Sequence, residues 1–301
     1  MTATTTSRVT VLYDRGVVSV TGADAEKLLG GLVTNEMAVL EGAPALYAAL
    51  LSPQGKILFD FFVVKAADGF LLETAREKTG ELVKRLAMYK LRAQVAIRDV
   101  SADFVVAALW GNTPVSSGET AGTYVFPDPR FAPLGLRVLA EADFARDVLA
   151  ATNGADAPAD NYHAYRIGLG VPEGGRDFAF GDTFPHEALL DQLNGVSFTK
   201  GCFVGQEVVS RMQHRATVRK RVVVVVAEHP LPTGPHPVLV GEVEIGRLGS
   251  VAGSRGLALL RIDRVAEAQR GGVPITVSGI PLSVEVPPFA TFEIGAPHEI
   301  A

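Results

Sequence analysis

The chain has 301 residues, of which 48% are hydrophobic and 20% are charged. A single hydrophobic core stops growing before this length, so two or three domains are expected, and no long polar run indicates disorder. The net charge is −5 with 28 lysines and arginines spread along the sequence, which argues against direct binding to duplex nucleic acid. The one basic cluster, at residues 211–221, is typical of a solvated face and would at most form a local anion site.

Cysteine usage and the N-terminal residues bear on the cellular compartment. The single cysteine, Cys202, excludes internal disulfides and any cysteine-rich zinc or iron-sulfur site built by one chain alone. The first residues lack an apolar segment after a basic flank, and no run of about 18 apolar residues follows anywhere. We therefore predict a cytoplasmic protein that neither enters nor crosses a membrane, with no metal site of its own.

The first hundred residues predict a mixed fold. Short strands at 9–13 and 17–20 flank turn residues at 14–16, which predicts a hairpin. Turn residues divide the apolar stretches between 45 and 74, and this spacing predicts an antiparallel meander. Further elements expected before residue 110 are a helix carrying Leu28, Leu29 and Leu32, a helix at 77–88, and strands at 92–97 and 104–109. This order indicates an α+β fold without repeated βαβ units.

The second half of the chain changes character twice. Exposed loops are expected at 112–122 and 153–158, and the glycine-rich stretch 168–182 is long enough to be a functional loop. Helices are expected near 143–151 and 159–167. After about residue 219, short strands alternate with Gly and Pro and predict an all-β barrel or sandwich; they lie at 222–226, 243–245, 257–262, 273–277 and 282–286.

One segment, Lys200–Glu207, combines the only thiol with a cation and two glycines in the sequence KGCFVGQE. A lysine two positions from Cys202 could favour the thiolate, which makes a reactive thiol physically reasonable. The alternative is a small buried hydrophobe in a tight turn, since free cysteines are often buried. Nucleophilic catalysis would also need a base, and the sequence leaves open whether a histidine reaches the sulfur; the candidates are His163, His186 and His214.

KGCFVGQE closely resembles the KGC[FY]xGQE signature of YgfZ-type proteins, a family related to the glycine cleavage T-protein that includes a mitochondrial iron-sulfur assembly factor. Other blocks of the family are also similar here, and they lie at 21–24, 32–35, 53–56, 170–172, 184–187 and 196–198. The resemblance implies a three-domain T-protein-like ring with a C-terminal all-β barrel and tetrahydrofolate in its central opening. The expected domains are a discontinuous first domain of 1–20 plus 104–218, an inserted domain of 21–103, and a barrel domain of 219–301.

The same resemblance implies the site residues. Folate contacts fall on Tyr162, on Arg15 in the first turn, and on Asp60, with Gln206 and Glu207 from the motif. Tyr162 could stack on a folate ring with its hydroxyl in water, or pack in the core. Arg15 stands where the best-known relative has an aromatic residue, and a guanidinium can stack or pair with a folate carboxylate. Cys202 and Lys200 are the candidate catalytic residues.

T-proteins carry paired aspartates after the glycine turn and a glutamate before the later glycine. Only Asp60 remains here, and Gly168 takes the glutamate position. Aminomethyl transfer needs a carboxylate near the folate nitrogens, so this loss weakens the reading as an enzyme. The resemblance therefore favours a tetrahydrofolate-binding accessory factor for assembly or repair of [4Fe-4S] proteins, including radical enzymes that modify tRNA. Its partners would be folate and iron-sulfur clients or assembly factors. The alternatives are a folate-dependent aminomethyl or methyl transferase and an interaction scaffold without folate.

Overall fold

The computed structural model describes residues 6–112, 118–120, 122–214 and 218–295. The chain divides into two compact units, each built from segments distant in sequence. The first unit contains 1–51, 59–162 and 193–204. The second contains 52–58, 163–192 and 205–301. The division between the units falls inside the KGCFVGQE motif, after Val204.

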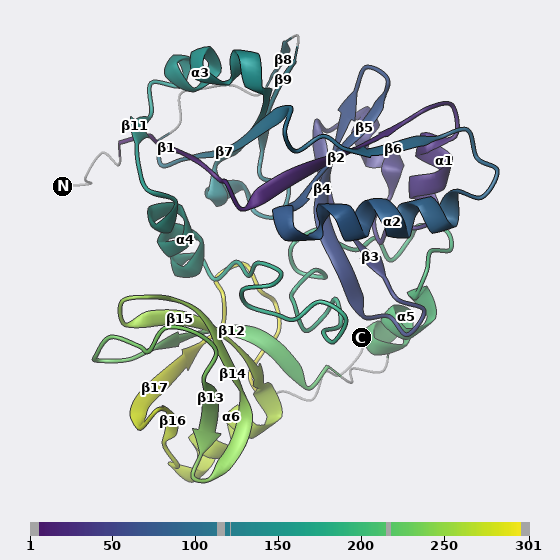
Figure 1. The fold of residues 1–301 in the computed structure, drawn as a ribbon. Helices are drawn as coiled ribbons and strands as arrows, with labels where there is room; N and C mark the ends of the chain where they lie inside the picture. The colour runs from purple at the N-terminus through teal and green to yellow at the C-terminus, as the bar shows by residue number, and fades with distance from the viewer. Residues whose placement is uncertain (1–5, 113–117, 121, 215–217, 296–301) are drawn as a thin grey trace. The chain divides into compact units, whose positions relative to one another are not determined.

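A six-stranded sheet in the first unit joins the chain start to residues a hundred positions later (Figure 1). Its order is β11-β1-β7-β10-β9-β8, and β1 pairs antiparallel with β7. Helix α3 covers one face of this sheet, where Ala145 packs with Ala107 and Val138. The elements are β1 Arg8–Val11, β7 Phe104–Trp110, β8 Gly118–Thr120, β9 Thr123–Pro127, η3 Ala132–Leu134, β10 Leu136–Glu141, α3 Ala142–Ala151 and β11 Ala155–Asp156.

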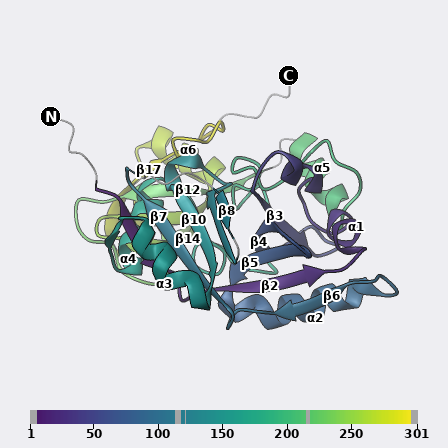
Figure 2. The ribbon, with the colours of Figure 1, turned by 90° about the horizontal axis from the view of Figure 1, so that it is seen from above.

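A second, five-stranded sheet has the order β3-β4-β5-β2-β6, and helix α2 runs alongside β2 and β6 (Figure 2). Strands β3, β4 and β5 form the meander expected from the turn residues. The elements are β2 Arg15–Thr21, α1 Ala25–Gly30, η1 Met37–Glu41, β3 Ala45–Leu51, β4 Ile57–Ala66, β5 Gly69–Ala75, η2 Arg76–Lys78, α2 Thr79–Lys90 and β6 Ala96–Asp99.

The hairpin predicted at the chain start is wrong. Strand β1 pairs with β7 and β11, whereas β2 pairs with β5 and β6 in the other sheet. Arg15 is therefore the first residue of a buried strand and does not lie in a hairpin turn. The turn residues between the strands carry the chain from one sheet to the next, a role that local sequence does not distinguish from a hairpin.

The second unit contains a closed barrel in the order β12-β15-β14-β13-β16-β17. The valine run 222–225 is buried, as expected of a barrel strand. Residues 169–205 contain no helix or extended strand, so the irregular segment predicted at 168–182 continues to the motif. The elements are α4 Ala159–Gly168, which spans the division between the units, α5 Gln206–His214, β12 Lys220–Val226, β13 Pro237–Val240, β14 Val243–Ala252, β15 Arg255–Arg261, α6 Ile262–Gly271, β16 Ile275–Val277 and β17 Ile280–Glu285.

The α+β class and the C-terminal β barrel are confirmed. Two helices were not predicted: α5 directly after the motif, and α6 between barrel strands β15 and β16. Residues 113–117 and 121 of the loop expected at 112–122 lie outside the described part of the chain, and 118–120 form β8. Among the helices that the structure describes, none has the length and apolarity needed to cross a membrane.

Candidate functional site

A network of buried side chains, most of them charged, lies in the first unit and contains two of the predicted site residues, Arg15 and Tyr162. It begins at Arg15, whose Nε donates to Glu73 on β5. The other carboxylate oxygen of Glu73 lies 3.6 Å from Nε of Arg137, on β10 of the six-stranded sheet. Arg137 Nη2 in turn donates to Asp128 at 3.2 Å and to the hydroxyl of Tyr162 at 3.1 Å. The network therefore connects the two sheets of this unit.

Arg130 completes the network. Its guanidinium forms a two-pronged pair with Asp128 at 3.0 and 2.8 Å. The guanidinium carbons of Arg130 and Arg137 each lie 5.1 Å from the centre of the Phe62 ring. Burial acts to raise the pKa of Asp128, but the charges of Arg130 and Arg137 outweigh it and hold that pKa below its usual value. The carboxylate is therefore ionised, as a buried charge with two cationic partners must be.

Asp60 joins the same region through Tyr47. The Tyr47 hydroxyl donates to Asp60 Oδ2 at 2.9 Å, and both side chains are buried. Burial, followed by the Asp60 charge, raises the pKa of Tyr47 well above its usual value. Tyr47 thus remains a neutral donor, and one oxygen of Asp60 accepts its hydrogen bond.

The hydroxyl of Tyr162 does not lie in water, contrary to the prediction from the sequence. The residue is 2% exposed, and its hydroxyl accepts from Arg137 where water contact was expected. Its ring packs edge-on against Trp110, with 5.5 Å between ring centres. The structure agrees with the alternative of core packing, and the prediction that the Tyr162 hydroxyl contacts water is wrong. Arg15 is similarly occupied by Glu73.

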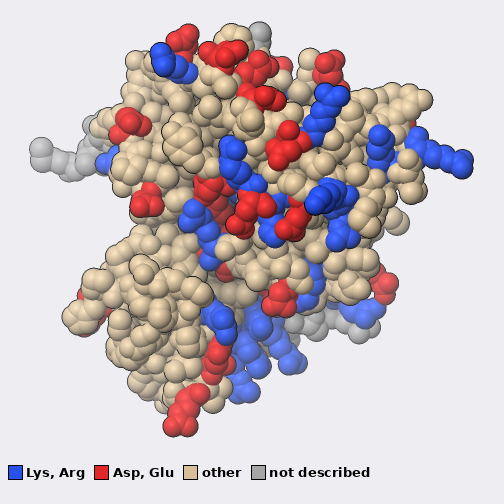
Figure 3. Space-filling view, viewed as in Figure 1, with Lys and Arg blue, Asp and Glu red and all other residues tan. Residues whose placement is uncertain are grey.

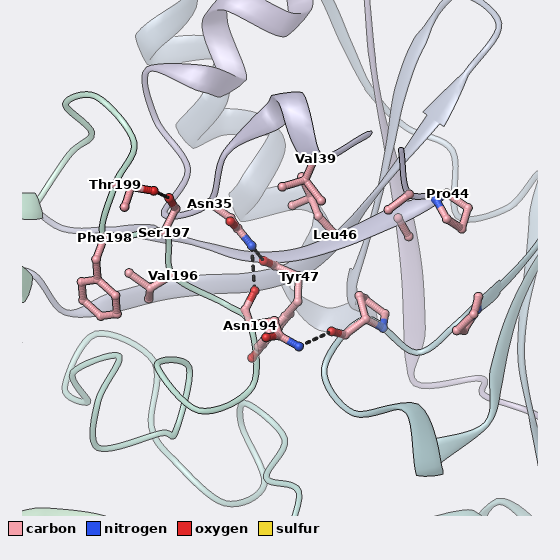
Figure 4. Close-up of a pocket in the computed structure, with 14 residues that line it drawn as sticks. Asn35, Val39, Pro44, Leu46, Tyr47, Asn194, Val196, Ser197, Phe198 and Thr199 are labelled. Atoms are coloured by element: carbon pink, nitrogen blue, oxygen red, sulfur yellow. Dashed lines mark hydrogen bonds between the residues drawn. The ribbon is translucent and has the colours of Figure 1, made fainter. Parts of the chain in front are cut away.

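A cavity of about 670 Å³ lies beside Tyr47 (Figure 4). Asn35 holds its wall together: its Nδ2 donates to the Tyr47 carbonyl at 2.8 Å and to the Asn194 carbonyl at 2.7 Å. Asn194 donates onward to the carbonyl of Pro129. The remaining wall is formed mainly by segments 43–47 and 196–199. This volume is in the range of small-molecule sites, and segment 196–199 leads directly into the motif.

Lys200 is held by backbone carbonyls at the end of α1 and in the segment that follows it. Its Nζ donates to the carbonyl oxygens of Gly30 at 2.9 Å, Val33 at 2.6 Å and Asn35 at 2.9 Å. An ammonium group has three donors, so all of them are used. Burial lowers the pKa of Lys200, and the charge of Glu36 opposes this shift. The cation therefore anchors the loop. Its predicted effect on the Cys202 thiol stays a prediction.

Cys202 itself is exposed, which rules out the alternative of a buried cysteine. Gln206 and Glu207 begin α5 in the second unit, and Glu207 pairs with Arg211 at the surface. The structure places these two residues in a different unit from Lys200 and Cys202.

The candidate bases also belong to the second unit. His163 contacts Glu173, and His186 contacts Gln213. The side chain of His214 lies outside the described residues.

Four network residues were missed from the sequence: Glu73, Asp128, Arg130 and Arg137. A signal was present for two of them, because Glu73 directly follows the apolar run Phe70–Leu72 and Arg137 stands between the apolar Leu136 and Val138. A charge at a buried strand position needs a partner, and here the two residues are partners of each other.

Tetrahydrofolate, the cofactor that the resemblance implies, needs both polar and aromatic partners. Folate presents a hydrogen-bonding pterin edge, a flat benzoyl ring and glutamate carboxylates. Buried guanidiniums, a carboxylate and tyrosines can meet these groups, and Nη1 of buried Arg137 has no hydrogen-bond partner among the described residues. These residue types therefore suit the cofactor, and Tyr47 is the one among them that lines the cavity. Within the described residues, no group of three or more His, Cys, Asp or Glu side chains could hold a metal ion.

Two known family models match this chain, one in its N-terminal part and one in its C-terminal part. Residues 12–116 match the family model described as the GCVT N-terminal domain, and residues 219–292 match the one described as the C-terminal β-barrel domain of CAF17. Among solved structures, the chain resembles the glycine cleavage system aminomethyltransferase T from Bartonella henselae. The TM-score is 0.76 at 17% identity, covering 95% of this chain and 86% of that one. The T-protein-like fold is thereby confirmed.

Curated relatives are similar over most of the chain. The mitochondrial iron-sulfur cluster assembly factor IBA57 of Mus musculus is 36% identical over 282 residues, covering 84% of this chain and 77% of the relative. The protein of the same name from Homo sapiens is 34% identical, with the same coverage. The IBA57 homolog of Mycosarcoma maydis is 35% identical over 240 residues, covering 74% of this chain and 59% of the relative.

All three of these relatives are named as mitochondrial, which contradicts the cytoplasmic location predicted from the sequence. A location depends on sorting signals that vary between relatives, so composition and a single reduced cysteine are poor guides to it. The identity to the mouse protein, together with the T-protein-like fold and the terminal barrel, shows that this chain belongs to the family of the iron-sulfur cluster assembly factor IBA57.

Proposed function

We propose that this protein binds tetrahydrofolate, or a derivative of it, and uses Cys202 in the assembly or repair of [4Fe-4S] proteins. Its membership of the IBA57 family supports the role in iron-sulfur assembly. The observation that carries the proposal is the anchored loop: Lys200 fixes the backbone with three hydrogen bonds while Cys202, two residues later, is exposed. A thiol in this position is available to a second molecule.

The thiol cannot hold a cluster alone. A [4Fe-4S] cluster takes four thiolate ligands, whereas the chain has one cysteine. Any cluster that Cys202 touches must therefore receive its other ligands from a client or from another assembly factor. We propose these proteins as partners, including radical enzymes that modify tRNA, and we retain the YgfZ-type signature as the segment that meets them.

The folate part of the proposal is supported by Arg15 and Tyr162, which belong to one network. Asp60 lies beside it, because its partner Tyr47 has its ring centre 6.0 Å from the guanidinium carbon of Arg130. Tyr47 both lines the cavity and donates to Asp60, so we propose that folate approaches the network from this side. Bound tetrahydrofolate would supply its nitrogen atoms as one-carbon acceptors. Tyr47 would keep Asp60 oriented, and Arg137 would offer its buried Nη1 to an acceptor. Gln206 and Glu207 remain proposed contacts.

The structure favours binding over aminomethyl transfer. A general base must reach the proton that it removes, and Asp60 is buried with one oxygen already bonded to Tyr47. We therefore expect no turnover when purified protein is given glycine, tetrahydrofolate and lipoyl carrier protein. Robust glycine cleavage would establish the transferase alternative instead.

Calorimetry with tetrahydrofolate tests the binding site. Replacing Tyr47 with phenylalanine keeps the ring and removes the bond to Asp60, so we expect affinity to fall about two- to tenfold, the worth of one hydrogen bond. Tyr162→Phe removes the bond to Arg137 without opening a cavity in the core. Tyr13→Phe is the matched control, because Tyr13 is 79% exposed and outside the network. Absence of binding by the wild type would leave the folate-free scaffold.

A further inference from the structure

A second cavity, of about 440 Å³, lies between α1 and the end of α2, away from the cavity beside Tyr47. We call it the α1–α2 groove. Leu28 and Leu32 contribute from α1 and the residues after it, and Tyr89 and Leu91 from the end of α2. The groove thus presents aliphatic and aromatic surface where two helix ends meet.

Leu91 is the unusual residue of this groove. Its backbone has φ +46° and ψ −108°, a combination that is rarely occupied by residues other than glycine. Its side chain is nevertheless 87% exposed, so packing in the fold does not offset the strain. Met88, one turn earlier on α2, is also 68% exposed. Strain that holds apolar side chains in solvent is a reason to expect a binding role.

The charges around the groove are nearly all positive. Lys27, Lys90 and Arg92 line it, and none of them forms an ion pair within the described residues. The only acid in the lining is Asp24, whose Oδ2 accepts from the backbone N–H of Gln94 at 2.7 Å. Blue side chains extend from the edge of the molecule that carries α1 and the end of α2 (Figure 3). The chain as a whole has a net charge of −5, so this local excess stands out.

We propose that the α1–α2 groove binds an acidic segment of a partner protein that carries leucine-like side chains. The apolar floor would take the side chains and the three cations would meet the carboxylates. Three cations neutralise too few phosphates for tight binding to nucleic acid, and a concave floor suits one inserted side chain better than a flat bilayer. Gly30, the last residue of α1, is also held by Lys200, so a partner in this groove would lie next to the anchor of the Cys202 loop.

The proposal is tested by fluorescence anisotropy with a short labelled peptide of repeating Glu-Glu-Leu. The combined variant Lys27→Glu, Lys90→Glu and Arg92→Glu turns three attractions for the peptide carboxylates into repulsions, so it should bind at least about tenfold more weakly. Lys84→Glu is the matched control, because Lys84 is an exposed cation on α2 that does not line the groove. It should bind the peptide like the wild type.

Leu91→Gly separates binding from a structural role. Glycine tolerates the strained backbone, so the variant should melt roughly 2 °C higher than the wild type while binding the peptide several-fold more weakly. A lower melting temperature with unchanged binding would overturn the proposal. So would equal affinity for a Glu-Glu-Ser peptide, or tighter binding of oligouridylate or phosphatidylserine vesicles with the same dependence on the three cations.

Discussion

Lys200 sits in a shell of backbone carbonyls that only an ammonium group satisfies fully. Replacing it with methionine keeps most of the side-chain volume but leaves the carbonyls of Gly30, Val33 and Asn35 without this donor. Because buried acceptors that lose a charged donor are costly, we expect Lys200→Met to lower the free energy of unfolding by about 3 kcal/mol. Urea denaturation measures this change.

Two variants sharpen the test of Lys200. Lys200→Arg should also destabilise the protein, because a planar guanidinium cannot reproduce three converging bonds from one nitrogen. Lys84→Met, at an exposed position, should change stability by less than about 0.5 kcal/mol. Normal stability of Lys200→Met would contradict the role of Lys200 as an anchor.

The lowered pKa of His186, in the second unit, leads to a prediction of how stability depends on pH. Burial lowers the pKa of His186 below its usual value of 6.5, and Arg221 adds to this while Asp191 opposes it. The unfolded chain binds the proton more readily than the folded chain. The contribution of neutral His186 to the free energy of unfolding is therefore fully present above pH 6.5, and it is lost as pH falls through the lower pKa of the folded state. His186→Gln should flatten the dependence of melting temperature on pH below 6.5. An unchanged slope would show that other groups cause it.

At the scale of elements, the turn between β3 and β4 contacts the helix that begins within the motif. Gly55 has φ +80°, and a Cβ at this position would lie 2.9 Å from Cβ of Val208 on α5. Gly253 has φ +64° with nothing near its Cβ position, which makes it a matched control for backbone strain. Gly55→Ala should therefore destabilise the protein by about 1–3 kcal/mol more than Gly253→Ala, as measured by thermal melting. Equal costs would show that this turn does not support α5.

Elements formed by interactions between residues close in sequence could be predicted, and elements that depend on distant residues could not. Strands β3 to β5 were predicted correctly, because turn residues and apolar runs are local signals. The separation of β1 from β2 was missed, because it depends on β7, nearly a hundred residues away. Helix α5 was missed because the glycines and the cysteine directly before it are typical of a loop, and its own first two residues are polar.

The candidate site shows the same limit. Resemblance to a family identified Arg15, Asp60 and Tyr162, which the structure joins in one region. Their partners Glu73 and Arg137 lie on strands of different sheets, so only the tertiary fold brings them together. The exposure of Tyr162 was misjudged for this reason, since no local pattern shows that a distant arginine takes its hydroxyl.

For the whole molecule, we propose three folding units: a discontinuous first domain of 1–20 plus 104–218, an inserted domain of 21–103 and the barrel domain of 219–301. The sheets argue for moving the first boundary to Arg15, because β2 pairs only within the second sheet. In hydrogen-exchange measurements, the amides of β1 should therefore show the same protection as those of β7. Their protection should differ from that of β2, although β2 is the neighbour of β1 in sequence. Joint exchange of β1 and β2 would contradict this division.

The central claim is that an exposed thiol, held out by an anchored loop, serves iron-sulfur assembly. The most direct measurement is the activity of a [4Fe-4S] enzyme in cells that lack the wild-type protein and express Cys202→Ser. Because Cys202 is exposed, the variant should keep its stability within about 0.5 kcal/mol, yet the enzyme activity should remain at the level of the deletion strain. Gly201→Ala, which adds a methyl group into open space beside the thiol, should restore activity. Full restoration by Cys202→Ser would contradict the claim and leave the loop with no role for its thiol.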